Sequence, residues 1–217
     1  MLDFGFYNMD CLEALKQMPD KCIDLAIVDP PYGNGSEDYD ATKKRYGGKF
    51  DKYFDEKQGG HNLNRWDVAP PPEYFKELFR VSKNQIIWGG NYFSLPPTRC
   101  FLVWRKLTIS ENFSMAMAEY AWTSFNDNAK VFEHVPQGKE RFHPTQKPVE
   151  LYEWILNRYA SPGDVILDTH VGSGSSLVAC RNTGHKYIGF EIDKTYFEKA
   201  KKRIEEQAAQ ANIFDFM

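Results

Sequence analysis

The run Ile23–Val28 is the segment that most narrows the possible folds, because nearly all of its residues are apolar. A strand with one face in water alternates apolar and polar residues, whereas a nearly continuous apolar run is typical of a strand buried on both faces of a parallel sheet. Six more segments have strand character: Phe4–Asn8, Gln85–Trp88, Phe101–Trp104, Ala118–Thr123, Val165–Leu167 and Lys186–Phe190.

Helical spacing of apolar residues fills most of the intervals between these strands. It follows Asp10 and the prolines Pro70–Pro72, and it recurs in Leu151–Tyr159, Ser175–Asn182 and Tyr196–Ile204. Strands that alternate with helices predict an open α/β sheet. No helical pattern separates the segments around Trp104 and Trp122, so we expect an antiparallel edge there.

Two long stretches carry no pattern of either kind. Residues 33–67 are polar and rich in glycine, and they are too many for a passive connection. This stretch holds a local excess of basic residues: Lys43, Lys44, Arg45, Lys49 and Lys52. Residues 126–141 also read as a loop. The formal net charge of −3 argues against nonspecific coating of nucleic acid, but it is compatible with a local basic patch.

The chain of 217 residues is expected to form a single domain. Its four cysteines include no C-x-x-C pair, which disfavours a zinc ribbon or a thioredoxin-type site, and we expect no metal centre. There is no apolar run of about 18 residues and no secretory signal pattern. The expected location is therefore the cytoplasm, without membrane association.

A glycine turn follows the strand Val165–Leu167, in the sequence Asp168-Thr169-His170-Val171-Gly172-Ser173-Gly174. Glycines allow a sharp turn and a close approach of the backbone to a ligand, and ligands of open α/β sheets bind at this end of the strands. Leu177 stands where a dinucleotide fingerprint requires a third glycine. Glu191 ends the next strand, where an acid can bind the hydroxyls of a ribose. We therefore expect a nucleoside without phosphates, such as S-adenosylmethionine.

The sequence Asp29-Pro30-Pro31-Tyr32 directly follows the buried strand Ile23–Val28. The prolines fix the backbone and leave the carbonyl of Pro30 free to accept a hydrogen bond, and Asp29 is a second acceptor. Two acceptors on the hydrogens of an exocyclic amine favour a pyramidal nitrogen whose lone pair points at a methyl donor. A base within a duplex has to be flipped out to reach such a pocket, and stacking on Tyr32 offsets part of that cost.

These motifs together resemble the DNA amino-methyltransferases that act on adenine N6 or cytosine N4, in the permuted branch where D-P-P-Y precedes the glycine turn. The resemblance extends over nearly the whole chain and includes the segments Asn8–Leu12, Ile87–Phe93, His143–Pro148 and Phe190–Asp193. It implies a seven-stranded, mostly parallel, Rossmann-like sheet with helices on both faces, dependent on S-adenosylmethionine. It also implies a DNA substrate and links the chain to DNA methylation in restriction-modification.

The resemblance assigns roles to individual residues. Asp29, Pro30, Pro31 and Tyr32 become the catalytic, base-binding residues. Asp10 is expected at the adenine of the cofactor and Glu191 at its ribose, although an N-cap is an equally good reading of Asp10. The methionine tail is assigned to Asp168, Gly172, Gly174, Thr145 and Lys147.

Two departures from the family stand out. Thr169-His170 replaces the large aromatic residue often found after the acid of the glycine turn, and His170 is interpreted as structural, with a cofactor contact as the alternative. No separate target-recognition domain is visible. DNA contacts are therefore expected from the loops 33–67 and 105–141, with Lys43, Lys44, Arg45 and Lys49 binding nucleic acid, or from the second subunit of a homodimer.

Other functions remain open at this point. N6 of adenine is the favoured target by resemblance alone, and N4 of cytosine, RNA or a protein amide share the same chemistry. A C5-cytosine enzyme is disfavoured because no cysteine follows a proline. A nicotinamide-dependent oxidoreductase and a cofactor-binding module without catalysis are the alternatives from other classes.

Overall fold

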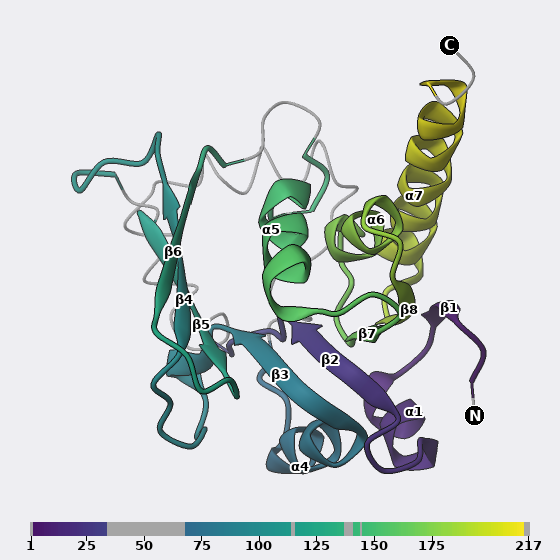
Figure 1. Ribbon diagram of the computed structural model, residues 1–217, viewed down its shortest axis with the longest axis horizontal. Coiled ribbons are helices and arrows are strands. Elements are labelled where there is room, and N and C mark those ends of the chain that lie inside the picture. The colour runs from purple at the N-terminus through teal and green to yellow at the C-terminus, as the bar shows by residue number, and fades with distance from the viewer. Residues whose placement is uncertain (1, 34–67, 114–115, 137–140, 144, 215–217) are drawn as a thin grey trace.

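The computed structural model describes residues 2–33, 68–113, 116–136, 141–143 and 145–214. Its centre is one eight-stranded sheet in the order β1-β8-β7-β2-β3-β5-β4-β6 (Figure 1). The strands in that order are Gly5–Asn8, Lys186–Glu191, Val165–Asp168, Ile23–Val28, Ser82–Trp88, Ala118–Thr123, Phe101–Lys106 and Lys130–His134. The expected open, mostly parallel, Rossmann-like α/β fold is confirmed.

Helices cover both faces of the sheet (Figure 1). Helices α1 (Cys11–Gln17) and α4 (Pro72–Val81) pack on one face, and α5 (Val149–Tyr159) and α6 (Ser175–Asn182) pack on the other. Helix α7 (Lys194–Phe214) packs beside α6 and the strands β1 and β8. Among the described residues, no helix has both the length and the apolar character needed to span a membrane.

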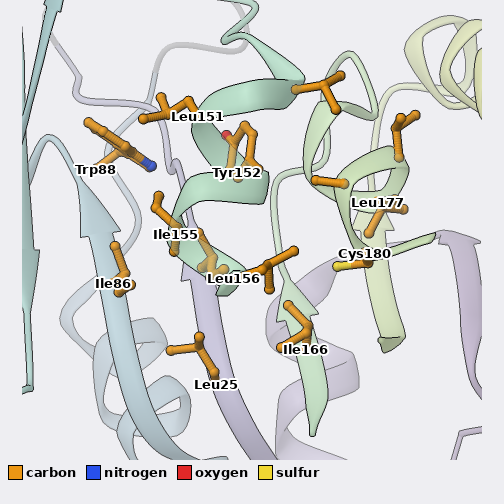
Figure 2. Close-up of a cluster of buried hydrophobic side chains, with 14 of the residues drawn as sticks. Leu25, Ile86, Trp88, Leu151, Tyr152, Ile155, Leu156, Ile166, Leu177 and Cys180 are labelled. Atoms are coloured by element: carbon orange, nitrogen blue, oxygen red, sulfur yellow. The ribbon is translucent and has the colours of Figure 1, made fainter. Parts of the chain in front are cut away.

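The central strand β2 shows why its sequence is nearly all apolar. Leu25 and Ile27 point into the cluster under α5 and α6, and Ala26 and Val28 point into the cluster under α1 and α4. Figure 2 shows Leu25 in the first cluster, with side chains from α5, α6 and the neighbouring strands. Both faces of β2 are therefore buried, as the sequence predicts.

The far side of the sheet differs from the expectation in one strand. The antiparallel edge is present, since β5 pairs antiparallel with both β3 and β4. However, β6 lies within the stretch 126–141, where we expected only a loop, and it makes the sheet eight-stranded rather than seven-stranded. It is a short edge strand whose Val131 is 60% exposed, so burial did not impose a recognisable strand pattern on it.

Candidate functional site

The motifs singled out in the sequence converge because five neighbouring strands run in the same direction. Strand pairs β1–β8, β8–β7, β7–β2 and β2–β3 are all parallel. The carboxyl ends of parallel strands meet at one edge of the sheet, where ligands of open α/β sheets bind. Asp29 follows β2 there, beside the glycine turn that follows β7, with Glu191 at the end of β8.

The carboxylate of Asp29 has a partner on each oxygen. The Tyr32 hydroxyl donates a hydrogen bond to Oδ1 over 2.8 Å, and the Lys147 ammonium forms a close ion pair with Oδ2. The Tyr32 ring stacks on Tyr92, with 4.7 Å between ring centroids. A Cβ atom on Gly89 would lie 2.1 Å from the Tyr32 ring, so glycine is needed there for Tyr32 to keep this position.

Lys147 is deeply buried, with a side chain only 2% exposed. It contacts Asp29 and also Glu119, whose Oε2 lies 3.1 Å from its Nζ, and it lies 5.2 Å from the ring centre of Trp88. Burial opposes the charged form of Lys147, but the two carboxylates outweigh it and raise its pKa above the ordinary value. We assigned Lys147 to the methionine tail, and the structure shows its ammonium paired with the Asp29 carboxylate.

Glu119 extends this cluster along β5 and was missed by sequence reasoning. Its Oε1 lies 2.5 Å from Nζ of Lys106, whose side chain is 8% exposed. Burial would raise the pKa of Glu119, but Lys147 and Lys106 lower it to about 2. The available signal was a lone acid in the otherwise uncharged strand Ala118–Thr123.

A cavity of about 420 Å³ opens beside these groups. Its lining includes the aromatic residues Tyr32 and Tyr92 and the charged residues Lys106, Glu119 and Lys147. The partners of Asp29 thus border a space of the size that small-molecule sites have, roughly 300–1,000 Å³.

Asp168 stabilises the glycine turn through hydrogen bonds. Its side chain accepts hydrogen bonds from the Ser176 hydroxyl and from the backbone N–H of His170. The residue is 3% exposed, and burial raises its pKa to about 7. Asp168 therefore holds the shape of the turn, and its assignment to the methionine tail remains a proposal.

Gly172 and Glu191 connect the turn to the neighbouring strand. The backbone N–H of Gly172 donates to Oε2 of Glu191 over 2.8 Å, and the N–H of Asp193 donates to Oε1 over 2.9 Å. Gly172 and Gly174 have φ values of +54° and +82°, a region that side-chain-bearing residues rarely occupy. A Cβ on Gly172 would lie 3.2 Å from the ring of His143.

The titration of Asp168 gives a testable pH dependence of stability. The native pKa of Asp168, about 7, exceeds the ordinary 3.8, so between these pH values the native state holds a proton that the unfolded chain has released. The stabilisation that this proton gives to the native state is lost as pH rises from about 4 to about 7, and the free energy of unfolding falls accordingly. Asp168→Asn is expected to make the change in unfolding free energy from about pH 5 to about pH 8 more positive by at least roughly 1 kcal/mol, because the variant lacks the loss that Asp168 causes. Urea unfolding of both proteins at the two pH values measures it.

An unchanged pH dependence in Asp168→Asn would contradict this assignment. The buried histidines do not confound the comparison, because they are present in both proteins. Burial lowers the pKa of His170 to about 4 and that of His143 to about 3, which makes stability rise with pH, the opposite sign.

Asp10 and His170, two further residues considered for the cofactor site, both make structural contacts. Asp10 is the N-cap of α1 and accepts a hydrogen bond from the N–H of Leu12 over 2.8 Å, so the capping interpretation is confirmed. His170 packs edge-on against Tyr74, and its Nδ1 lies 2.9 Å from the Thr169 hydroxyl, as a structural side chain does.

The Thr145 hydroxyl lies 3.2 Å from Nδ1 of His143. The basic residues Lys43, Lys44, Arg45 and Lys49 lie outside the described residues.

Comparisons with known proteins agree with this arrangement. Residues 100–202 match the family model described as DNA methylase, of the N6 and N4 type. The Type II methyltransferase M.HpaI from Haemophilus parainfluenzae is 27% identical, over 95% of this chain and 74% of that protein.

Two solved structures share the fold. The M1.HpyAVI–SAM complex has a TM-score of 0.54 at 22% identity and covers 91% of this chain and 98% of that one. The cytosine-N4-specific PvuII DNA methyltransferase has a TM-score of 0.60 at 14% identity, over 95% of this chain and 92% of that one. Together with the motifs at the carboxyl edge of the sheet, these matches show that the chain is similar to DNA methyltransferases over nearly its whole length, and that residues 100–202 match the family model of the N6 and N4 type.

Proposed function

We propose that the protein transfers a methyl group from S-adenosylmethionine to the exocyclic N6 amine of an adenine flipped out of double-stranded DNA. One observation carries the proposal: Asp29-Pro30-Pro31-Tyr32 and the glycine turn follow the paired parallel strands β2 and β7, so an amine acceptor and a nucleoside-binding turn lie side by side. A methyl donor on the turn and an amine on Asp29 are then neighbours.

The residues at the turn fit the cofactor. The positive φ values at Gly172 and Gly174 keep the backbone free of side chains, and Glu191 offers a carboxylate at the end of β8, where a ribose is expected. Asp10 lies after β1 on the far side of Glu191, in line with a contact to the adenine. When bound, S-adenosylmethionine supplies an electrophilic methyl group on a sulfonium.

The residues at Asp29 position the amine. The Asp29 carboxylate and the Pro30 carbonyl accept its two hydrogens, which points the nitrogen lone pair toward the methyl group. Preorganised acceptors stabilise the positive charge that develops on the nitrogen as the new N–C bond forms. Tyr32, which lines the cavity and stacks on Tyr92, offers an aromatic surface for the extruded base.

N4 of cytosine is the second candidate target. The same two acceptors hold that amine, and the cytosine-N4-specific PvuII enzyme shares the fold at a TM-score of 0.60. Nucleoside mass spectrometry tests the proposal and separates the two bases. The protein is incubated with S-adenosylmethionine and unmethylated DNA, and the digested nucleosides are analysed. We expect N6-methyladenine. N4-methylcytosine would keep the mechanism and make cytosine the target base. If the protein binds the cofactor but forms no methylated nucleoside, the proposal is contradicted.

The same proposal assigns DNA contacts to one domain, residues 1–217, through the loops 33–67 and 105–141. The second of these contains strand β5, which the sequence predicts, and strand β6, which it does not. We also propose a homodimer, in which the second subunit would add contacts to the DNA. Light scattering coupled to gel filtration, with and without DNA, tests it.

The basic residues of the first loop give a prediction on salt dependence. Each phosphate contact contributes about −0.9 to the slope of log K against log salt concentration, because counterions are released. Replacing Lys43, Lys44, Arg45 and Lys49 by Gln is expected to weaken DNA binding and to flatten this slope by roughly 2–4 units. Fluorescence anisotropy over a salt series measures it, and an unchanged slope would remove these residues from the DNA interface.

A further inference from the structure

The charged residues around Asp29 form a row that the two acceptors of the D-P-P-Y motif do not explain. Lys147 contacts Asp29 and Glu119, and Glu119 contacts Lys106. Four separate parts of the chain supply this row: Asp29 follows β2, Glu119 lies on β5, Lys106 ends β4, and Lys147 precedes α5. Glu119 and both lysines line the cavity beside Tyr32.

The positive charge of Lys147 opposes the stabilisation that Asp29 gives to the reacting amine. The reacting nitrogen gains a unit of positive charge before it releases a proton, and the buried ammonium of Lys147 lies directly against the carboxylate that should stabilise this charge. The Asp29–Lys147 pair is neutral as a unit, so its field at the amine is weak. In surroundings of low dielectric constant, such charges interact more strongly than in water.

Glu119 resolves this problem. Its carboxylate lies 3.1 Å from the Lys147 ammonium, so Asp29, Lys147 and Glu119 carry a net charge of −1 together. Lys106 brings the whole row to zero, but it pairs with Glu119 at the other end of the row from Asp29. The ammonium has three donors, so it can bind Glu119 and Asp29 at the same time. Each oxygen of Asp29 has a second lone pair, and Oδ2 keeps one for an amine hydrogen while Lys147 remains bound.

Resting on the function proposed above, we propose that Glu119 is a positioning residue for methyl transfer. It balances the charge of Lys147 and so leaves the Asp29 carboxylate effective toward the cationic nitrogen. In the step itself, the lone pair of the amine forms the N–C bond, the S–C bond electrons remain on the cofactor sulfur, and the nitrogen then releases one proton to solvent. Glu119 takes part in no bond change.

The test is the single-turnover rate of methylation at saturating cofactor and DNA. Glu119→Gln keeps the shape and removes the charge, and we expect the rate to fall by about 10- to 100-fold, the range of a lost electrostatic contribution in an active site. The dissociation constant of S-adenosylmethionine should change by less than about twofold, because Glu119 lies on β5, which β3 and β2 separate from the strand β7 that carries the glycine turn. The matched control is Glu206→Gln, an exposed acid on α7 paired with Lys202 and outside both stretches assigned to DNA contacts, which should leave the rate unchanged.

Two further variants separate positioning from a purely structural role. Glu119→Asp keeps the charge and should recover part of the rate. Lys106→Met removes the cation on the far side of Glu119, so the rate should stay the same or rise, and this variant also serves if Glu119→Gln does not fold. In a Lys147→Met background, Glu119→Gln should have little further effect, since the two residues act together.

The proposal is overturned if Glu119→Gln methylates at the wild-type rate, if Lys106→Met loses activity by more than about tenfold, or if the effects of Glu119→Gln and Lys147→Met simply add. These outcomes all presuppose an active wild-type protein. A wild-type protein that transfers no methyl group to DNA overturns the proposed function itself, so the two failures are distinguishable.

Discussion

Replacing Asp29 by Asn is expected to reduce methyl transfer to DNA by about 10³-fold, near the upper end of what the loss of one preorganised electrostatic contact costs. Asn retains one acceptor oxygen but lacks the negative charge that stabilises the developing cation on the amine. The affinity for S-adenosylmethionine should change little, because Asp29 follows β2 and the cofactor is assigned to the turn after β7. Single-turnover methylation and calorimetric titration of the cofactor measure the two effects separately.

The choice of Asn follows from the burial of Lys147. Its side chain is 2% exposed, and removal of one partner from a buried ion pair costs about 3–5 kcal/mol of stability. Asp29→Ala would leave the ammonium with Glu119 alone on that side and would mix lost folding with lost chemistry. Asn keeps an oxygen for the Lys147 ammonium or the Tyr32 hydroxyl, so the variant is expected to fold.

Asp20→Asn is the matched control for this experiment. Asp20 also pairs with a cation, Arg80, but its side chain is 76% exposed and lies away from the cavity. It should methylate DNA at the wild-type rate. If Asp29→Asn also retains the wild-type rate, Asp29 is not the amine acceptor; if it loses cofactor affinity and methylation in the same proportion, its assignment to the base is wrong.

Local patterns were sufficient to predict most of the fold. The apolar run of β2 and the helical spacing in α4 and α5 reflect burial that acts on consecutive residues, and such burial is readable from the sequence. Strand β6 was not predictable in this way. It has one neighbour, β4, and alternate residues of it are exposed, so its pairing rather than its composition makes it a strand.

The candidate site was predictable only where its residues are close in the sequence. Asp29-Pro30-Pro31-Tyr32 and the glycine turn are short motifs in which neighbours in the chain act together. The contact of Asp29 with Lys147 spans 118 positions, and Glu119 joins them from a third element. Periodicity carries no information on such long-range ion pairs, which arise only from the order of strands in the sheet.

The structure also distinguishes two acids that look alike in the sequence, since both lie at the carboxyl end of a strand at the same edge of the sheet. Asp29 pairs with a cation and a phenol, and both of these partners line the cavity. Asp168 faces a hydroxyl and a backbone amide and is 3% exposed. The first is suited to chemistry, and the second is suited to holding the turn that the cofactor needs.

That turn provides the second large effect: Gly172→Val is expected to weaken S-adenosylmethionine binding by roughly 10- to 100-fold. A side chain costs about 1–2 kcal/mol in the left-handed region, where Gly172 lies at φ +54°, and each 1.4 kcal/mol is a factor of ten in affinity. The new Cβ would also lie 3.2 Å from the His143 ring, and relaxation of the turn would break the bond from the Gly172 N–H to Glu191.

Gly184→Val separates loss of the site from general strain. Gly184 has φ +74°, so Val there carries a similar backbone cost, but a Cβ at this position meets no atom within 4 Å. This control should lose stability in thermal unfolding and keep its affinity for the cofactor, whereas Gly172→Val should lose both. If the two variants bind S-adenosylmethionine equally well, backbone strain is the only consequence of a side chain at Gly172. The glycine turn then does not approach the cofactor, and the methyl donor has to bind elsewhere along the edge of the sheet.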